Sequence, residues 1–259
     1  MTVTALMLAL LAQISGNTLQ TTRISKQHLD ATQCTRMVLD ALESDLSNLI
    51  SENGLTAVVA QDASNNTRLA FLTRGRGPDS SGSDSSRFLA VSYELSGNEI
   101  QRKLSPIAWS TLDLMGVVTG AFTSTTSNEF GKGVLRFEVA AILDSGTTVS
   151  LSQTGAWKTS YVNGQTIASP FSALVLRNYL ETTGTALHIR SLVVAVAAMD
   201  EQNLNLPNAK NMGSSLPSPT GTQTPMEAWN AAITSGSLAH YPRPAQAALH
   251  IDQRTVQLK

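Results

Sequence analysis

The chain has 259 residues, of which 42% are hydrophobic and 14% are charged, and its formal net charge is −1. A chain of this length can bury one sizeable core or two small ones. Its 18 lysine and arginine residues are scattered, whereas nucleic-acid binding normally needs a basic cluster, so we expect no nucleic acid among its partners. The single cysteine, Cys34, excludes an internal disulfide, and the four histidines lack the spacing of a metal site. We therefore predict no metal and no cofactor.

Residues 3–14 (VTALMLALLAQI) are apolar on every face of a helix. The run is too short to span a membrane, which takes about twenty residues. No lysine or arginine precedes it and no clear small-residue cleavage site follows it, so it is not a convincing secretory signal. Two interpretations remain, a buried core helix or the C-terminal part of a membrane helix whose upstream half lies outside this sequence. Under the second, the side chains that pack in a membrane or a filament are Val3, Leu6, Leu8, Leu10, Leu11 and Ile14.

The helical pattern continues beyond this run but becomes amphipathic, and Leu39, Leu42, Leu46 and Leu49 keep the helical spacing. With a stop at Asn53–Gly54, the pattern predicts one helix over residues 1–53, about 75 Å long. The helix is expected to be continuous or to have a single kink or local loosening at Gly16 and Asn17. A globular domain does not need so long a helix, so half of it must find partners outside its own fold. The side chains predicted to pack on the rest of the chain are Met37, Val38, Leu42, Leu46, Leu49 and Ile50.

After Gly54 the period changes from helix to strand. Residues 55–60 and 69–73 predict short strands. Residues 87–95 and 99–104 predict a hairpin across Ser96–Gly97–Asn98, and residues 134–143 and 147–151 predict a second one across Asp144–Ser145–Gly146. Further along, the sequence predicts a helical turn, a buried central strand, a short helix carrying Trp229 and a last strand, over residues 170–179, 189–199, 226–233 and 248–258. A helix is the alternative for residues 189–199.

A helix followed by consecutive hairpins predicts an α+β fold, with the long N-terminal helix packed on an antiparallel β-sheet. The sheet and its connections form a head domain of residues 54–259. Two connections, residues 75–86 and 203–225, are rich in serine, glycine, proline and asparagine and predict disordered loops.

Residues 142–148 (ILDSGTT) resemble the active-site loop of aspartic proteases. Such enzymes need two aspartates that share one proton, and the sequence has no second copy of the motif. A hairpin turn accounts for the same residues, so we predict an exposed turn at Asp144 and no catalytic residue. Asp79 and Asp84 lack the ordered ligand spacing of a known calcium loop.

Several segments resemble type IV pilin-like proteins. The passage from an apolar helix to an amphipathic one (ALMLALLAQISGNTLQTTR, then MVLDALESDLSNLI) resembles their spine, most closely that of J-type minor pseudopilins of type II secretion. Residues 36–45 (RMVLDALESD) are similar to the segment in which an arginine, apolar steps and an acidic pair precede the head. Residues 88–95 followed by 100–102 resemble the first hairpin, apolar-x-Tyr-x-Leu and then x-x-Arg.

Three later segments resemble more closely a pilin-like group called Verru_Chthon cassette protein C. They are residues 136–143, 190–200 and 244–258, and the last contains Ile251–Asp252–Gln253–Arg254. Family members begin with a basic leader, a cleavage site and an early glutamate. None of these is present here, so no residue is carried over for processing or N-terminal methylation.

The resemblance implies a structural, non-enzymatic subunit of a type II secretion or type IV pilus-like filament. Its partners would be other pilin-like subunits and the bacterial inner membrane, crossed once, with the head in the periplasm. Two other functions stay open. One is a membrane-tethered extracytoplasmic binding module, which long polar loops and Trp109, Trp157 and Trp229 would suit. The other is an aspartic-type peptidase.

Overall fold

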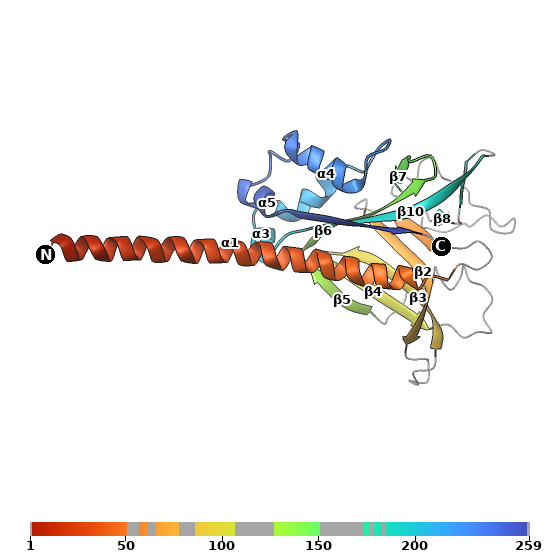
Figure 1. The fold of residues 1–259 in the computed structure, drawn as a ribbon, viewed down its shortest axis with the longest axis horizontal. Coiled ribbons are helices and arrows are strands. Elements are labelled where there is room, and N and C mark those ends of the chain that lie inside the picture. The colour runs from red at the N-terminus through yellow and green to blue at the C-terminus, as the bar shows by residue number, and fades with distance from the viewer. Residues whose placement is uncertain are drawn as a thin grey trace.

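The computed structural model describes residues 2–50, 57–61, 66–77, 86–106, 127–150, 174–176, 179–182 and 185–257. One long N-terminal helix lies along two antiparallel β-sheets, and short helices cover the outer face of one of them (Figure 1). The α+β class and the packing of the helix on antiparallel strands are confirmed. The single sheet that was expected is instead two sheets.

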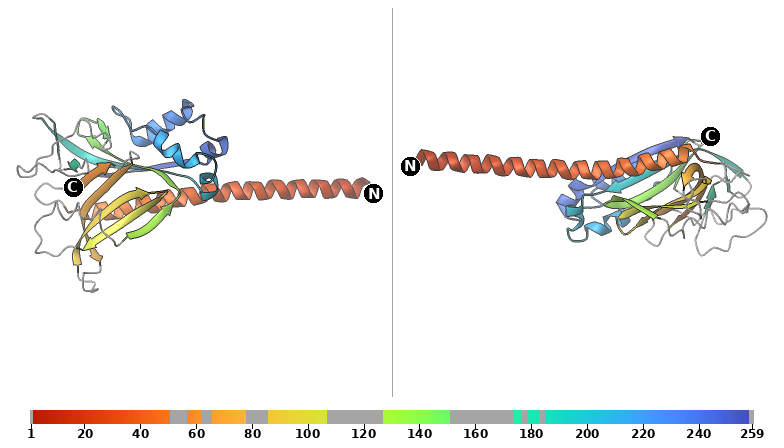
Figure 2. Two further views of the ribbon diagram at one scale, coloured as in Figure 1. Left: turned by 180° about the vertical axis from the view of Figure 1, so that it is seen from behind. Right: turned by 90° about the horizontal axis from the view of Figure 1, so that it is seen from below.

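Helix α1, Thr2–Ser47, has 46 residues and runs without a break through Gly16 and Asn17. Its first part projects beyond the head (Figures 1 and 2). The helix ends before the predicted stop at residues 53–54, because the chain joins the edge of strand β2. There the Ile50 backbone N–H donates to the Leu72 carbonyl (2.9 Å), and the Arg74 N–H donates to the Asn48 carbonyl (3.0 Å).

The first sheet has six strands in the order β5-β4-β3-β2-β1-β8, and the second has β11-β10-β6-β7 with β9 paired to β10. The first sheet consists of β1 Ala57–Gln61, β2 Thr67–Gly77, β3 Ser86–Ser96, β4 Glu99–Pro106, β5 Ser127–Lys132 and β8 Leu174–Leu176. The second sheet consists of β6 Val134–Leu143, β7 Thr148–Ser150, β9 Tyr179–Thr182, β10 Thr185–Ala198 and β11 His250–Gln257.

Both predicted hairpins are present, β3 with β4 and β6 with β7, and Gly97 has the positive φ (62°) that the first turn requires. The predicted central strand is β10, which lies between β6 and β11. Within residues 170–179 the described residues belong to strand β8 and to the start of strand β9, and not to a helical turn. Strands β5 and β9 were not predicted.

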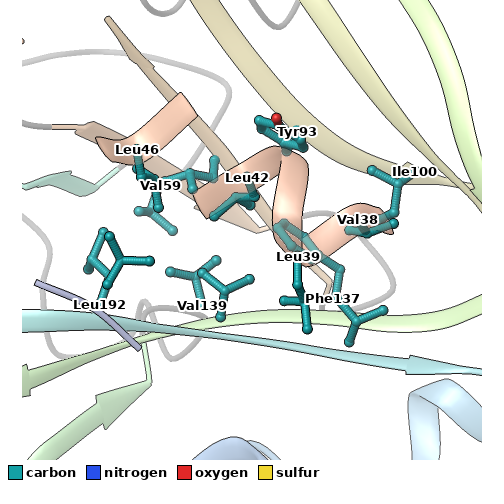
Figure 3. Close-up of a cluster of buried hydrophobic side chains, with 14 of the residues drawn as sticks. Val38, Leu39, Leu42, Leu46, Val59, Tyr93, Ile100, Phe137, Val139 and Leu192 are labelled. Atoms are coloured by element: carbon teal, nitrogen blue, oxygen red, sulfur yellow. The ribbon is translucent and has the colours of Figure 1, made fainter. Parts of the chain in front are cut away.

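The first core fills the space between the two sheets and α1 (Figure 3). Leu42 and Leu46 of the helix meet Val59 and Tyr93 of the first sheet and Val139 of the second. The helix therefore shares a core with both sheets, and the expected boundary between residues 53 and 54 divides that core.

A second core lies between the outer face of the second sheet and a helical cap. The cap consists of α3 Glu201–Leu204, 3₁₀-helix η1 Ala209–Ser215, α4 Pro225–Thr234 and α5 Arg243–Ala248. Residues 203–225, which were expected to form a disordered loop, are therefore part of a packed layer. Leu204, Met212 and Leu216 are buried, and at Gly213 an added Cβ would lie 1.9 Å from the Leu135 carbonyl oxygen. Most of the other such segment, residues 78–85, lies outside the described residues.

Candidate functional site

The docked segment of α1, residues 31–47, is the part that enters the first core. Val38, Leu39, Leu42 and Leu46 are almost completely buried and follow each other at helical spacing (Figure 3). Among the side chains predicted to pack on the head, Val38, Leu42 and Leu46 lie in this core. Leu49 packs against it from the end of the helix, and Ile50 is half-buried.

The prediction placed Met37 against the head as well, but this side chain is 49% exposed. Successive residues of a helix are rotated by about 100°, so the position before Val38 turns toward solvent. Leu39 is fully buried and was missing from the predicted set, although its spacing to Leu42 and Leu46 indicated it.

The projecting segment of α1, residues 2–30, has a different surface. Its first charged residue is Arg23. Among the described residues, every large hydrophobic side chain that is exposed belongs to α1: Met7, Leu11, Ile14, Leu19, Leu29 and Met37.

Six side chains were predicted to pack in a membrane or filament, and two of them, Leu11 and Ile14, are exposed in the single chain. The backbone at Val3, Leu6, Leu8 and Leu10 is helical, but their side chains lie outside the described ones. Over the residues that the structure describes, α1 and the other helices lack the combined length and apolar character needed to cross a membrane.

A cluster around Asp45 fixes the docked segment to the first sheet. Arg102 of β4 donates from Nε to Asp45 Oδ2 (2.8 Å) and from Nη2 to Oδ1 (2.9 Å). The hydroxyl of Tyr93 on β3 donates to the same carboxylate. Burial, together with the Asp45 charge, raises the pKa of Tyr93 well above its ordinary value, so the hydroxyl stays protonated and remains a donor. These three residues come from the segments that resemble pilin-like proteins.

A second arginine holds the helix from the other sheet. Arg254 of β11 lies 3.0 Å from Asp40 (Nη2 to Oδ1) and 3.3 Å from Glu43 (Nη1 to Oε2). All three side chains are exposed, so these ion pairs orient the helix and contribute little to stability. The two arginines thus contact the docked segment from the two sheets between which it lies.

Gly131, in β5, allows the helix to approach the strand closely. Its φ is +69°, and an added Cβ would lie 2.4 Å from Val38 Cγ2. A larger residue would strain the backbone and push Val38 away, so glycine at this position is part of the helix–head contact.

The second sheet contains a buried ion pair beneath the cap. Arg136 and Glu138 of β6 are 2% and 0% exposed, and Arg136 Nη2 lies 2.8 Å from Glu138 Oε2. Ser150 of β7 donates to Glu138 Oε1 (2.6 Å), and Arg136 donates to the Ser218 hydroxyl of the cap (3.3 Å). The pair therefore connects two strands and the cap.

Asp144 lies in an exposed turn between β6 and β7, as predicted. The Gly146 N–H donates to the Leu143 carbonyl (2.9 Å), and Gly146 has a φ of +81°. The motif thus supplies turn geometry.

Replacement of Asp144 by asparagine should leave the unfolding free energy unchanged within about 0.5 kcal/mol, since the side chain is on the surface. Urea denaturation of the two proteins measures this. A peptidase activity that disappeared in the variant would contradict the assignment of the motif to a turn.

Three tryptophans and two loop aspartates were considered in the sequence as possible ligand-binding residues. Trp229 is fully buried in the second core and donates from Nε1 to the Pro217 carbonyl (2.9 Å). Trp109, Trp157, Asp79 and Asp84 lie outside the described residues. Within the described ranges, no three histidine, cysteine, aspartate or glutamate residues gather closely enough to hold a metal ion.

Among solved structures, the chain is similar to a type IV-like pilin from Thermus thermophilus, at 13% sequence identity and a TM-score of 0.39. The similarity covers 88% of this chain and 94% of the other. No family model and no curated protein matches the sequence.

Proposed function

We propose that this chain is a structural, non-enzymatic, pilin-like subunit that joins other such subunits in a filament through α1. The observation that carries the proposal is the distribution of apolar surface: the large hydrophobic side chains described as exposed all belong to this helix. Soluble monomers rarely expose large contiguous apolar patches, so such a surface marks a site of association.

The docked segment supports the same role. Its buried stripe, the Asp45 cluster, Arg254 and the contact at Gly131 fix the helix to the head over several turns. Because these contacts come from both sheets, the head and the helix form one body. A subunit built in this way can transmit the position of its helix in an assembly directly to its head.

The finer assignment rests on the sequence resemblance. We propose a minor pseudopilin-like subunit of a type II secretion or type IV pilus-like filament, held in the bacterial inner membrane by the N-terminal helix, with its head in the periplasm. Residues 3–14 are apolar on every face of the helix, which suits contact with lipid and with other helices in a filament core, although this run alone is shorter than a membrane span. Asp45, Tyr93 and Arg102 come from the resembling segments and form one cluster that docks the helix on the head.

Substitution of both Leu11 and Ile14 by lysine tests the proposal. Both side chains are exposed, so the thermal midpoint of the head should not change. The charges should abolish self-association and binding to other pilin-like subunits, because an apolar helix contact would then have to bury them. Sedimentation and pull-down assays measure both.

Gln20→Lys is the matched control, since it adds a charge at an exposed polar position of the same segment. It should affect association much less than the double substitution. A double variant that associates like the parent protein would refute the proposed function.

A further inference from the structure

Helix α1 and strand β11 lie side by side and run in the same direction (Figures 1 and 2). Arg254 of the strand contacts Asp40 and Glu43 of the helix, which fixes the register between the two elements. His250 precedes Arg254 by four residues, which is about 13 Å along a strand. A helix covers that distance in about nine residues, so His250 lies opposite residues 31–34 of α1.

His250 is half-buried at this contact and has three ionisable neighbours, His28 and Arg36 of the helix and Asp252 of its own strand. His28 and Arg36 are eight positions apart, about one helical turn on either side of residue 32, so they lie on one side of α1. Burial lowers the pKa of His250 from its ordinary 6.5, and His28 and Arg36 lower it further, whereas Asp252 raises it. A protonated His250 therefore lies beside a guanidinium and a second imidazole, with one carboxylate to offset its charge.

The other described charges on the elements near this contact lie elsewhere. They are Lys26 and Asp30 of α1, Arg190 of β10, Asp200 and Glu201 at the start of α3, Glu227 of α4 and Arg243 of α5. Lys26 and Asp30 are two positions from His28, a rotation of about 200° around the helix. Asp200 and Glu227 bond the first backbone N–H groups of their helices, and Arg190 is at the opposite end of β10 from His250. Glu201 and Arg243 are exposed.

The part of α1 beside His250, residues 27–36, is here called the entrance segment, and it is held less firmly than the residues that follow it. Its buried side chains are all small: Ala31, Cys34 and Thr35. Gln27 donates to Gln202 Oε1 of the cap (2.8 Å), a neutral hydrogen bond at an exposed position. Residues 38–46 bury valine and leucine side chains instead, and a larger buried apolar area gives a stronger contact. Repulsion at His250 can therefore release the entrance segment while residues 38–46 stay docked.

We propose that the contact between α1 and β11 is a pH-sensitive switch: when His250 takes up a proton, the entrance segment separates from the strand and the projecting helix can change its angle to the head. This inference goes beyond the proposed function, because it concerns a contact within one chain and holds whether or not the chain assembles. The docked state lowers the pKa of His250, so the released state binds more protons. Docking of the entrance segment therefore weakens as the pH falls below about 6.5.

Hydrogen–deuterium exchange of the full chain tests the switch, at a dilution at which the chain sediments as a monomer. Amide exchange is measured at about pH 7.5 and about pH 5, on either side of the range in which histidine ordinarily titrates, and each rate is divided by the intrinsic rate at that pH. The corrected rate of the entrance segment should be several-fold higher at the lower pH. The limit is about tenfold per pH unit, because His250 takes up one proton. Residues 38–46 should change much less.

Three variants identify the group responsible. His250→Gln keeps a polar side chain but cannot take up the proton, so its corrected rates should be equal at the two pH values. Asp252→Asn removes the offsetting carboxylate and should enlarge the increase at low pH. His240→Gln is the matched control, because it removes an exposed histidine of the cap and should respond like the parent protein.

Each variant is compared with itself at two pH values, so a general loss of stability does not imitate the result. Equal corrected rates in the parent protein at both pH values would overturn the proposal. A His250→Gln variant whose entrance segment responds like that of the parent would overturn it as well, since the response would then come from another group.

Discussion

Replacing Arg136 by methionine should lower the unfolding free energy by about 3–5 kcal/mol, a large part of the 5–15 kcal/mol typical of a domain. The substitution removes the guanidinium that lies 2.8 Å from the carboxylate of the fully buried Glu138. A buried carboxylate retains the hydrogen bond from Ser150 but loses the guanidinium that offsets its desolvation. Urea denaturation monitored by circular dichroism measures the loss.

The double variant Arg136→Met, Glu138→Leu separates the loss of the pair from the loss of one partner. It removes both charges and should recover much of the stability, because a buried ion pair and apolar side chains of similar volume contribute about equally. Arg254→Met is the matched exposed control, expected to cost at most about 1 kcal/mol. If Arg136→Met costs no more than this control, the pair beneath the cap has no special role in stability.

The local elements could be predicted from the sequence where one periodicity persists. Helix α1 follows from a long apolar and then amphipathic pattern, and the two hairpins follow from alternating strands on either side of Gly97 and Gly146. The end of α1 could not be predicted in the same way. It depends on hydrogen bonds from residues 48–50 to β2, a tertiary contact that the helical pattern does not contain.

The division into two sheets and the presence of the cap were not predicted, for a related reason. Alternation shows that a segment is a strand but not which strand pairs with it. In the cap, Leu204, Met212 and Leu216 are separated by polar residues, so the composition resembles a disordered loop. Likewise Arg136 and Glu138 alternate with apolar residues, a pattern typical of a solvent-exposed face, and become buried only because the cap covers them.

The candidate site could be predicted in part. The apolar character of the projecting segment is evident from residues 3–14 alone. The cluster of Asp45, Tyr93 and Arg102 is not, since these residues are far apart in the chain and no spacing rule connects them. Met37 shows what the apolar pattern of the docked segment does not reveal. It is an apolar residue next to the buried side chains of the helix, yet it is exposed to solvent.

A shortened chain that begins at Gly54 is expected to aggregate, whereas one that begins at Thr18 should fold as a single soluble domain. The first removes the whole helix, and the second removes only part of the projecting segment. Without the docked segment, the first core loses Val38, Leu39, Leu42 and Leu46, all buried between the two sheets. Burying four such side chains contributes about 1.5–3 kcal/mol each, which together is comparable to the stability of a domain.

The loss would extend beyond apolar contacts. Removal of Asp45 takes away the hydrogen-bond acceptor of the buried Tyr93 hydroxyl and the charge partner of Arg102. It also exposes the inner faces of two sheets as one apolar surface, larger than the few hundred Å² that soluble monomers tolerate. Light scattering and thermal melts of the two shortened chains measure the difference. If the chain from Gly54 is monomeric and melts like the chain from Thr18, the helix is an appendage of an independently folded head. A rigid connection between helix and head, on which the pilin-like proposal depends, would then be lost.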